Sequence, residues 1–97
     1  MEETKMIKLW YKTIKGEKIT NSEIREFSAS FSEQSFLVQL REVCDKFNIS
    51  TPVLLRTHFK HLQTFNVLHF KPADFIDEVD FDKMDVEIVK EKKPNRY

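Results

Sequence analysis

The chain has very little glycine and cysteine, and it lacks long apolar runs. Gly16 is the only glycine in 97 residues, which excludes the glycine-rich loops that cradle nucleotide phosphates. Cys44 is the only cysteine, so no internal disulfide can form. No apolar run approaches the roughly 20 residues of a membrane helix, and charges interrupt residues 1–15, where a signal peptide would need an apolar core. We therefore expect a soluble cytoplasmic protein without a membrane segment.

The chain also lacks an excess of charge of either sign. Sixteen Lys and Arg balance sixteen Asp and Glu, so the net charge does not favour nucleic acid or an anionic membrane. The hydrophobic fraction of 40% includes nine phenylalanines, which a disordered chain would not contain. This length suits one domain only. We expect residues 1–97 to form a single domain with frayed ends at 1–4 and 92–97.

Two strands are predicted before the first helix. Residues 6–14 alternate, and one face collects Ile7, Leu9, Tyr11 and Thr13. A turn at Gly16 leads to a returning strand over 18–28. The apolar residues of this second strand do not keep one parity; they are Ile19, Ile24 and Phe27. The pattern therefore requires a bulge or a break near Asn21 and Ser22.

Two helices follow, over 30–48 and 51–66. In the first, apolar residues recur at spacings of three and four, Ser30 with Glu33 has the spacing of a capping box, and Ser32 is a competing N-cap. In the second, Thr51 is the predicted N-cap and Pro52 the first helical residue. Asn48 and Asn66 are expected to end the two helices. One arc of the second helix is predicted to face the core, namely Leu54, Leu55, His58, Phe59, Leu62 and Phe65.

Two short strands complete the pattern. They are expected over 67–71 and 85–89, joined by a turn and an acidic connection over 72–84. The order is strand, strand, helix, helix, strand, strand. We predict an α+β fold with two layers, in which an αα-hairpin covers one face of a mainly antiparallel sheet (order ββααββ).

Residues 36–65 can be interpreted in two ways. A three-residue connection between the helices suits a helix-turn-helix, and Arg56, Thr57 and Lys60 would then face the DNA groove. However, the turn lacks the usual glycine, strands flank the motif, and the net charge is zero. An αα-hairpin that covers a sheet has the same apolar pattern and is the interpretation we favour.

Metal and catalytic sites find little support. His58 and His61, three residues apart on a helix, could bind a metal together with a carboxylate, or they could bond backbone groups at the edge of the core. There is no H-E-x-x-H motif, no second cysteine and no calcium-loop motif. Cys44 lies on the apolar face of the first helix, where a thiol is unreactive. We expect no catalytic residue, no metal and no cofactor.

Three segments are candidates for contact with a protein partner. Trp10 lies between lysines, Arg56, Thr57 and Lys60 belong to a stretch without Asp or Glu (47–73), and Asp77, Glu78 and Asp80 belong to an acidic stretch (74–87). Two interpretations of the basic and acidic stretches stay open: both are solvated and neutralise each other, or one meets a partner of opposite charge. Trp10 could stack on nucleic acid bases, anchor a protein partner or pack beneath another segment.

The segments KLWYKTIK (8–15), TPVLLRTHFKHLQTFN (51–66) and DFIDEVDFDKM (74–84) resemble a group of short bacterial proteins of unassigned function. The resemblance spans most of the chain. It implies a small free-standing bacterial protein and supplies no activity or site residues. We therefore expect a non-enzymatic protein–protein interaction module that binds a protein partner or itself. The alternative is a DNA-binding regulator that uses residues 36–65.

Overall fold

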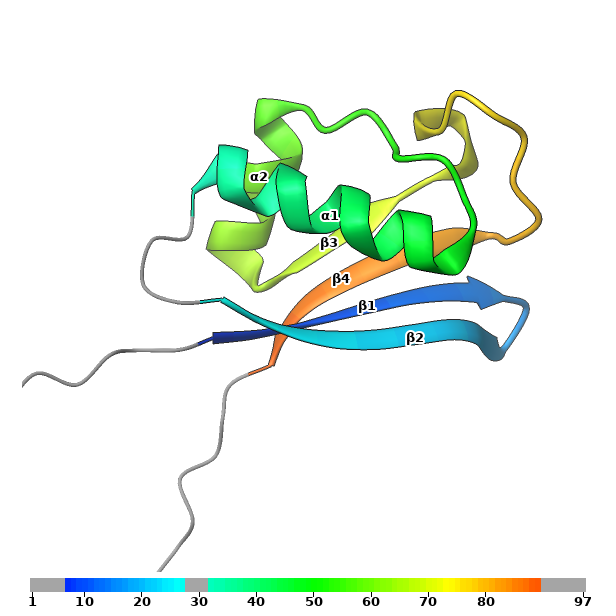
Figure 1. The fold of residues 1–97 in the computed structure, drawn as a ribbon, viewed down its shortest axis with the longest axis horizontal. Helices are drawn as coiled ribbons and strands as arrows, with labels where there is room; N and C mark the ends of the chain where they lie inside the picture. Colours follow the sequence, from blue (N-terminus) through cyan, green and yellow to red (C-terminus); the bar gives the residue numbers. More distant parts are fainter. Residues whose placement is uncertain (1–6, 28–31, 90–97) are drawn as a thin grey trace, which may run out of the picture.

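The computed structural model describes residues 7–27 and 32–89 and consists of a sheet covered on one face by helices (Figure 1). Its elements are β1 (Ile7–Lys15), β2 (Lys18–Phe27), α1 (Glu33–Phe47), α2 (Arg56–Phe65), β3 (Val67–Phe70), the 3₁₀ turn η1 (Pro72–Asp74) and β4 (Lys83–Val89). The sheet order is β2-β1-β4-β3, and every neighbouring pair is antiparallel. The predicted α+β class and the order of strands and helices are confirmed. The segments predicted to fray, 1–4 and 92–97, lie outside the described residues.

The parity predicted for β1 is confirmed. Leu9, Tyr11 and Thr13 are fully buried beneath the helices. Their neighbours on β4 share this face, because cross-strand partners in an antiparallel sheet point the same way. The strand side of the core is thus built from alternate residues of the central strands and of β3: Leu9, Tyr11, Thr13, Met84, Val86, Leu68 and Phe70.

A bulge in β2 explains its broken parity. Thr13 pairs with Asn21 and Ile14 pairs with Ile19, so Thr20 is left between them as an extra residue. Thr20 Oγ1 lies 2.7 Å from Thr13 Oγ1, and Asn21 Nδ2 donates to the same oxygen at 3.1 Å. Both side chains therefore turn toward the core side. The bulge was predicted near Asn21 and Ser22 and lies one residue earlier.

The bulge leaves β2 with a polar inner face. Asn21, Glu23 and Arg25 pair with the core-facing residues of β1 and so point toward the helix layer. Glu23 accepts hydrogen bonds from Arg25 Nε at 2.7 Å and pairs with Lys46 Nζ of α1 at 3.1 Å. Arg25 Nη1 also lies 3.3 Å from Glu42 Oε1. This ion-pair cluster joins the edge of the sheet to α1.

Helix α1 is closed at both ends by local side chains. Ser32 is the N-cap, as the alternative prediction had it; its hydroxyl accepts the Ser35 N–H at 3.1 Å. Asn48 adopts the left-handed conformation at the C-cap, as predicted. The inner face of the helix buries four residues, which are Phe36, Leu40, Val43 and Cys44. Ser30, the other predicted cap, lies outside the described residues.

Helix α2 begins later than predicted. The prediction that Thr51 caps it and Pro52 opens it is wrong, because the helix starts at Arg56 with Leu55 as N-cap. Residues 51–55 belong to neither a helix nor a strand, and the Val53 N–H bonds the carbonyl oxygen of Asp74 at 2.8 Å. A tertiary hydrogen bond and the burial of Pro52 thus override the local helix-start pattern. The three-residue turn of a helix-turn-helix is consequently absent between α1 and α2, and residues 48–55 connect them.

The buried arc of α2 is also smaller than predicted. Phe59 and Leu62 are buried, whereas Leu55 and Phe65 are 52% and 61% exposed. Leu55 precedes the helix rather than lying within it. Phe65 occupies the last helical position, and left-handed Asn66 then turns the chain directly into β3. Its ring therefore reaches the end of the sheet instead of the core.

Candidate functional site

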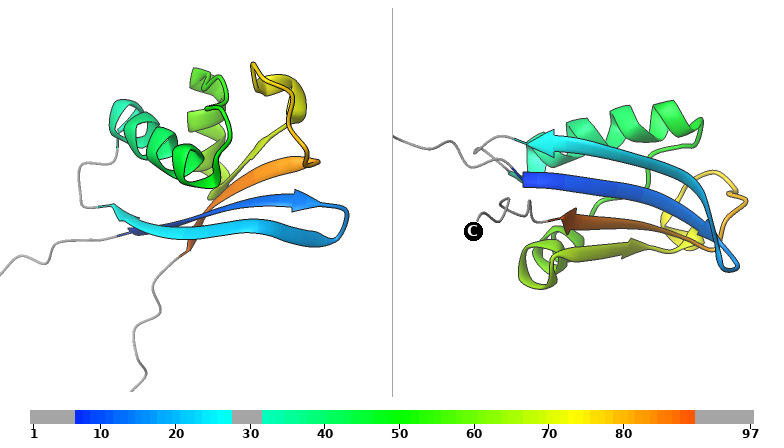
Figure 2. Two further views of the ribbon diagram at one scale, coloured as in Figure 1. Left: turned by 45° about the vertical axis from the view of Figure 1, so that its right-hand side comes forward. Right: turned by 90° about the horizontal axis from the view of Figure 1, so that it is seen from below.

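The sheet face opposite the helices, here called the open face, is uncovered by any described element (Figure 2). Trp10, Lys12 and Ile14 of β1 lie on it, because the intervening residues face the core. Their neighbours share the face by register. These are Ile19, Ser22 and Ile24 of β2, Lys83, Asp85 and Glu87 of β4, and Val67 and His69 of β3.

Trp10 is held in a defined position at the centre of the open face. Its Nε1 donates to Ser22 Oγ at 2.8 Å, which ties β1 to β2. The Lys12 ammonium lies 3.7 Å from the centroid of the Trp10 ring and 3.3 Å from Glu87 Oε1. The Lys12 side chain is only 14% exposed, so part of its charge is already desolvated by the ring. The arrangement fixes the indole ring, with the Lys12 ammonium over its face and the Glu87 carboxylate beside that ammonium.

A hollow of about 740 Å³ lies beside Trp10. Its apolar lining comes from four elements and consists of Trp10, Phe65, Val67, Ile88 and Val89. Exposed Phe65 forms one wall from the end of α2. A concave aromatic and apolar lining with a few polar groups at its edge is the usual form of an anchor site for a partner side chain.

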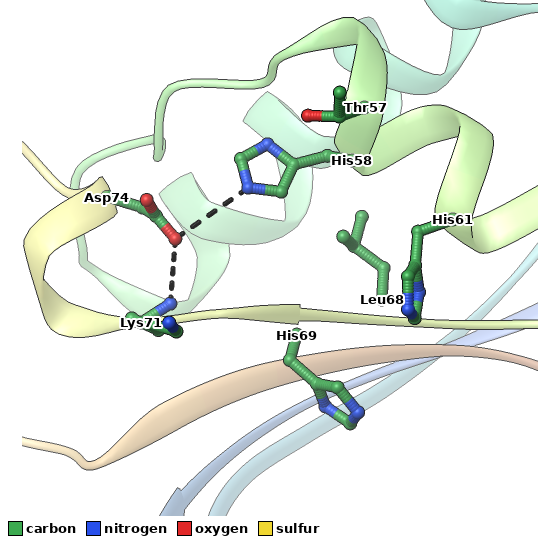
Figure 3. A pocket seen from close by; sticks show the side chains of 7 residues that line it. All are labelled: Thr57, His58, His61, Leu68, His69, Lys71 and Asp74. Atoms are coloured by element: carbon green, nitrogen blue, oxygen red, sulfur yellow. Dashed lines mark hydrogen bonds and ion pairs between the residues drawn. The ribbon is translucent and has the colours of Figure 1, made fainter.

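All three histidines line a second pocket of about 430 Å³, between α2 and β3 (Figure 3). His58 Nδ1 accepts the Leu55 N–H at 2.9 Å, and its Nε2 lies 3.8 Å from Asp74 Oδ2. His61 Nδ1 lies 2.9 Å from the carbonyl oxygen of Val67, and His69 Nδ1 lies 2.6 Å from Asp85 Oδ1. A carbonyl or carboxylate oxygen can only accept, so Nδ1 carries the proton in both rings.

These contacts give the histidines structural roles. His58 supplies the hydrogen bond that Leu55, as N-cap, has no side-chain oxygen to make. Figure 3 shows His58 and His69 on opposite sides of β3, so the rings do not converge on one point. Within residues 7–27 and 32–89, no group of three His, Cys, Asp or Glu is arranged to hold a metal ion. The pocket therefore provides no metal centre built from these side chains.

The residues singled out from the sequence lie on three separate surfaces. Trp10 is on the open face, whereas Arg56, Thr57 and Lys60 are exposed on α2 in the other layer. Asp77, Glu78 and Asp80 are exposed in the loop between η1 and β4. This loop meets the β1–β2 turn, where Asp80 Oδ1 lies 3.1 Å from Lys15 Nζ and Asp82 Oδ2 accepts the Gly16 N–H at 2.7 Å. Among the described ion pairs, none links this loop to Arg56 or Lys60.

Two buried groups are chemically inert. Burial raises the pKa of the Cys44 thiol to about 12, so the nucleophilic thiolate is scarce at neutral pH. Burial also raises the pKa of the Tyr11 hydroxyl far above its ordinary value, and this hydroxyl donates to Gln39 Oε1 at 2.7 Å. Neither group is poised for catalysis.

Comparison of the chain with family models, curated proteins and solved structures gives no match. None of the helices in the described part of the chain is long and apolar enough to cross a membrane. The site must therefore be interpreted from its own geometry.

The sequence interpretation found Trp10 but missed most of the residues around it. The sequence pattern places four of these residues in strands or a helix and predicts no surface role for them: Ile19, Ile24, Phe65 and Val67. The broken parity of β2 was the available signal, since it shows that the two isoleucines can share a face only across a bulge. Which face they share depends on the packing of α1 against Glu23 and Arg25, and this could not be read from the pattern.

Proposed function

We propose that this protein is a non-enzymatic protein–protein interaction module that binds its partner through the open face of the sheet. The observation that carries the proposal is the orientation of β2. A strand with one solvated face normally turns its apolar residues inward. Over residues 21–25 of β2 the inner face is polar, while Ile19 and Ile24 are 49% and 57% exposed on the open face.

Further features of the same surface support this proposal. Trp10 is fixed by Ser22 and Lys12, so a partner would meet it without a large loss of side-chain entropy. Tryptophan is enriched among the residues that dominate binding energy at protein interfaces. Apolar side chains gathered with polar ones at their edge mark an interaction site rather than a random surface.

An affinity capture experiment with matched variants tests the proposal. Wild-type, Ile24→Lys and Ile76→Lys chains are immobilised and exposed to an extract of the cells that produce the protein. Ile76 is 81% exposed in the loop between η1 and β4, away from the open face, and serves as control. We expect a set of proteins retained by wild type and Ile76→Lys and reduced about tenfold by Ile24→Lys. If Ile24→Lys retains the same proteins as wild type, the open face is not the binding surface.

A second candidate function is DNA binding through α2. Exposure of Arg56, Thr57 and Lys60 on one helix supports it, because these side chains can reach phosphates and base edges. The connection over residues 48–55 is longer than the turn of a helix-turn-helix. Fluorescence anisotropy with a labelled duplex at low and moderate salt separates the two functions. DNA binding predicts affinity that falls steeply with salt and is lost on joint Arg56→Glu and Lys60→Glu substitution.

We further propose that the protein acts in the cytoplasm. A single buried cysteine and the absence of disulfides among the described residues support a reducing compartment. Membership of a group of short bacterial proteins stays a prediction from the sequence. Detection of the protein in cytoplasmic rather than secreted fractions would test the location.

A further inference from the structure

We infer that the partner at the open face is a second copy of this chain, packed face to face about a twofold axis that runs between β1 and β4 and parallel to them. This inference rests on the proposed function, since it names the occupant of the same surface. In a twofold interface the two subunits use the same patch, so that patch must be complementary to itself. Charge, shape and area on the open face can each be compared with this requirement.

The two central strands carry opposite charge where they meet. On the open face, β1 contributes Lys8 and Lys12 on either side of Trp10, and β4 contributes Lys83, Asp85 and Glu87, so β1 is basic and β4 carries a net negative charge. A surface complementary to this one must place acid over β1 and base over β4. The same face rotated about an axis between the two strands satisfies this condition, because it exchanges β1 with β4.

The register makes the central contact specific. Trp10 and Glu87 are cross-strand neighbours, so the rotation places the Glu87 of each copy over the Trp10 of the other. The Lys12 ammonium lies over that Trp10 ring and 3.3 Å from its own Glu87. Lys12 and Asp85 are also cross-strand neighbours, so the rotation places the Asp85 of each copy over the Lys12 of the other. Each Lys12 would then lie among its own Glu87 and the Asp85 and Glu87 of the second copy.

The same rotation matches a protruding side chain to a hollow. Ile24 is the neighbour of Trp10 on β2, and Val67 is the neighbour of Glu87 on β3. Exchanging β1 with β4 also exchanges β2 with β3, so Ile24 of one copy faces Val67 of the other. Val67 lines the hollow that also includes Phe65 and Trp10. Ile24, 57% exposed in the single chain, would become buried there.

The size of the open face limits the surface area that the dimer can bury. Four strands about 4.8 Å apart and the seven residues of β4 at about 3.3 Å each give roughly 19 Å by 23 Å, or roughly 440 Å² in projection. This is about half of the ~800 Å² that each partner buries in a standard interface. The dimer is therefore weak and forms reversibly at high protein concentration.

Sedimentation equilibrium of the purified chain tests for self-association from about 10 µM to about 1 mM, the range that suits a small interface. We expect a reversible dimer whose dissociation constant rises about tenfold or more in Ile24→Lys and is unchanged in Ile76→Lys. Circular dichroism of each variant confirms that it is folded. A chain that stays monomeric throughout this range, or a dimer weakened equally by both variants, would overturn the inference.

Cross-linking tests the axis itself. The variants Ile24→Cys and Val67→Cys each add one accessible thiol, while Cys44 stays buried and unreactive. With a short bismaleimide, we expect a mixture of the two variants to give more covalent dimer than either variant alone. Dimer formed best by Ile24→Cys alone would place β2 against β2 and overturn this axis.

The two levels of the proposal can fail separately. If the chain is monomeric but Ile24→Lys still loses proteins in the capture experiment, the partner is a different protein and the proposed function stands. If capture does not respond to Ile24→Lys and the chain is also monomeric, both the proposed function and this inference are wrong.

Discussion

Substitution of Glu23 by glutamine tests whether the ion-pair cluster between β2 and α1 stabilises the fold. Glu23 accepts a hydrogen bond from Arg25 Nε at 2.7 Å and lies 3.1 Å from Lys46 Nζ, and its side chain is 17% exposed. The hydrogen bond from Arg25, followed by that from Lys46, lowers the pKa of the Glu23 carboxyl. Glutamine keeps the size of the side chain and removes the charge.

The expected loss of stability is modest and depends on pH. Exposed ion pairs contribute about 0.2–1 kcal/mol and hydrogen bonds to charged groups about 1.5–3 kcal/mol, so we expect Glu23→Gln to cost about 1 kcal/mol at pH 7. The pKa of Glu23 is lower in the folded than in the unfolded chain. Its contribution is therefore fully present above the unfolded value of about 4.3 and is lost as the pH falls through the folded value.

Urea denaturation of both proteins at pH 7 and in a series down to about pH 3 measures this effect. The difference in unfolding free energy should be constant near neutrality and shrink in acid. Glu42→Gln serves as control, because Glu42 is 59% exposed and its one ion pair among the described residues is with Arg25 Nη1, at 3.3 Å. A difference that stays the same from pH 7 to pH 3 would show that the Glu23 charge does not stabilise the fold.

Three further predictions concern the caps and the core. Cys44 should not react with Ellman's reagent at pH 8 until the chain is unfolded, because burial raises its thiol pKa to about 12; rapid reaction of the folded protein would contradict this. Asn48→Gly should leave the melting temperature unchanged or raised, whereas Asn48→Ala should cost about 1 kcal/mol, because the residue has φ of 63°. His58→Ala should cost about 1 kcal/mol in urea denaturation through loss of the Leu55 N–H acceptor, and His58→Gln should recover most of it.

Much of the fold follows from local patterns in the sequence. Alternation in β1 predicts its buried face, because a strand with one covered face repeats every two residues. The predicted C-terminal ends of both helices are confirmed at Asn48 and Asn66, and both residues adopt the left-handed conformation there. These features depend on residues that are close together in the sequence, so they can be predicted without knowledge of the tertiary structure.

The beginning of α2 could not be predicted in the same way. Thr51 and Pro52 have the composition of a helix start, yet residues 51–55 are not helical. The Val53 N–H donates to the carbonyl of Asp74, twenty-one positions further along the chain. Leu54, in the same segment, packs at the edge of the core. A contact of this range outweighs the small free energies of helix capping.

The candidate site was predicted only in part for the same reason. The clear alternation of β1 predicts that Trp10 lies on the surface. The residues that surround Trp10 on that surface come from β2, β3, β4 and the end of α2. Arg56, Thr57 and Lys60 drew attention through their charge, and the fold places them in the other layer. A cluster of charged residues in the sequence does not show which residues share a surface. That depends on which strands and helices the fold brings together.

The orientation of β2 links stability to the proposed binding role. If the edge strand were turned over, Ile19 and Ile24 would gain burial under α1, and Glu23 and Arg25 would be solvated without the cost of partial burial. The observed arrangement forgoes that gain and retains an extra residue, Thr20, that keeps both isoleucines on the open face. A single chain gains the ion pairs of Glu23 with Arg25 and Lys46 from this orientation. Burial of the isoleucines against a partner would add to that gain, because the apolar area left exposed in one chain would then be removed from water in the complex.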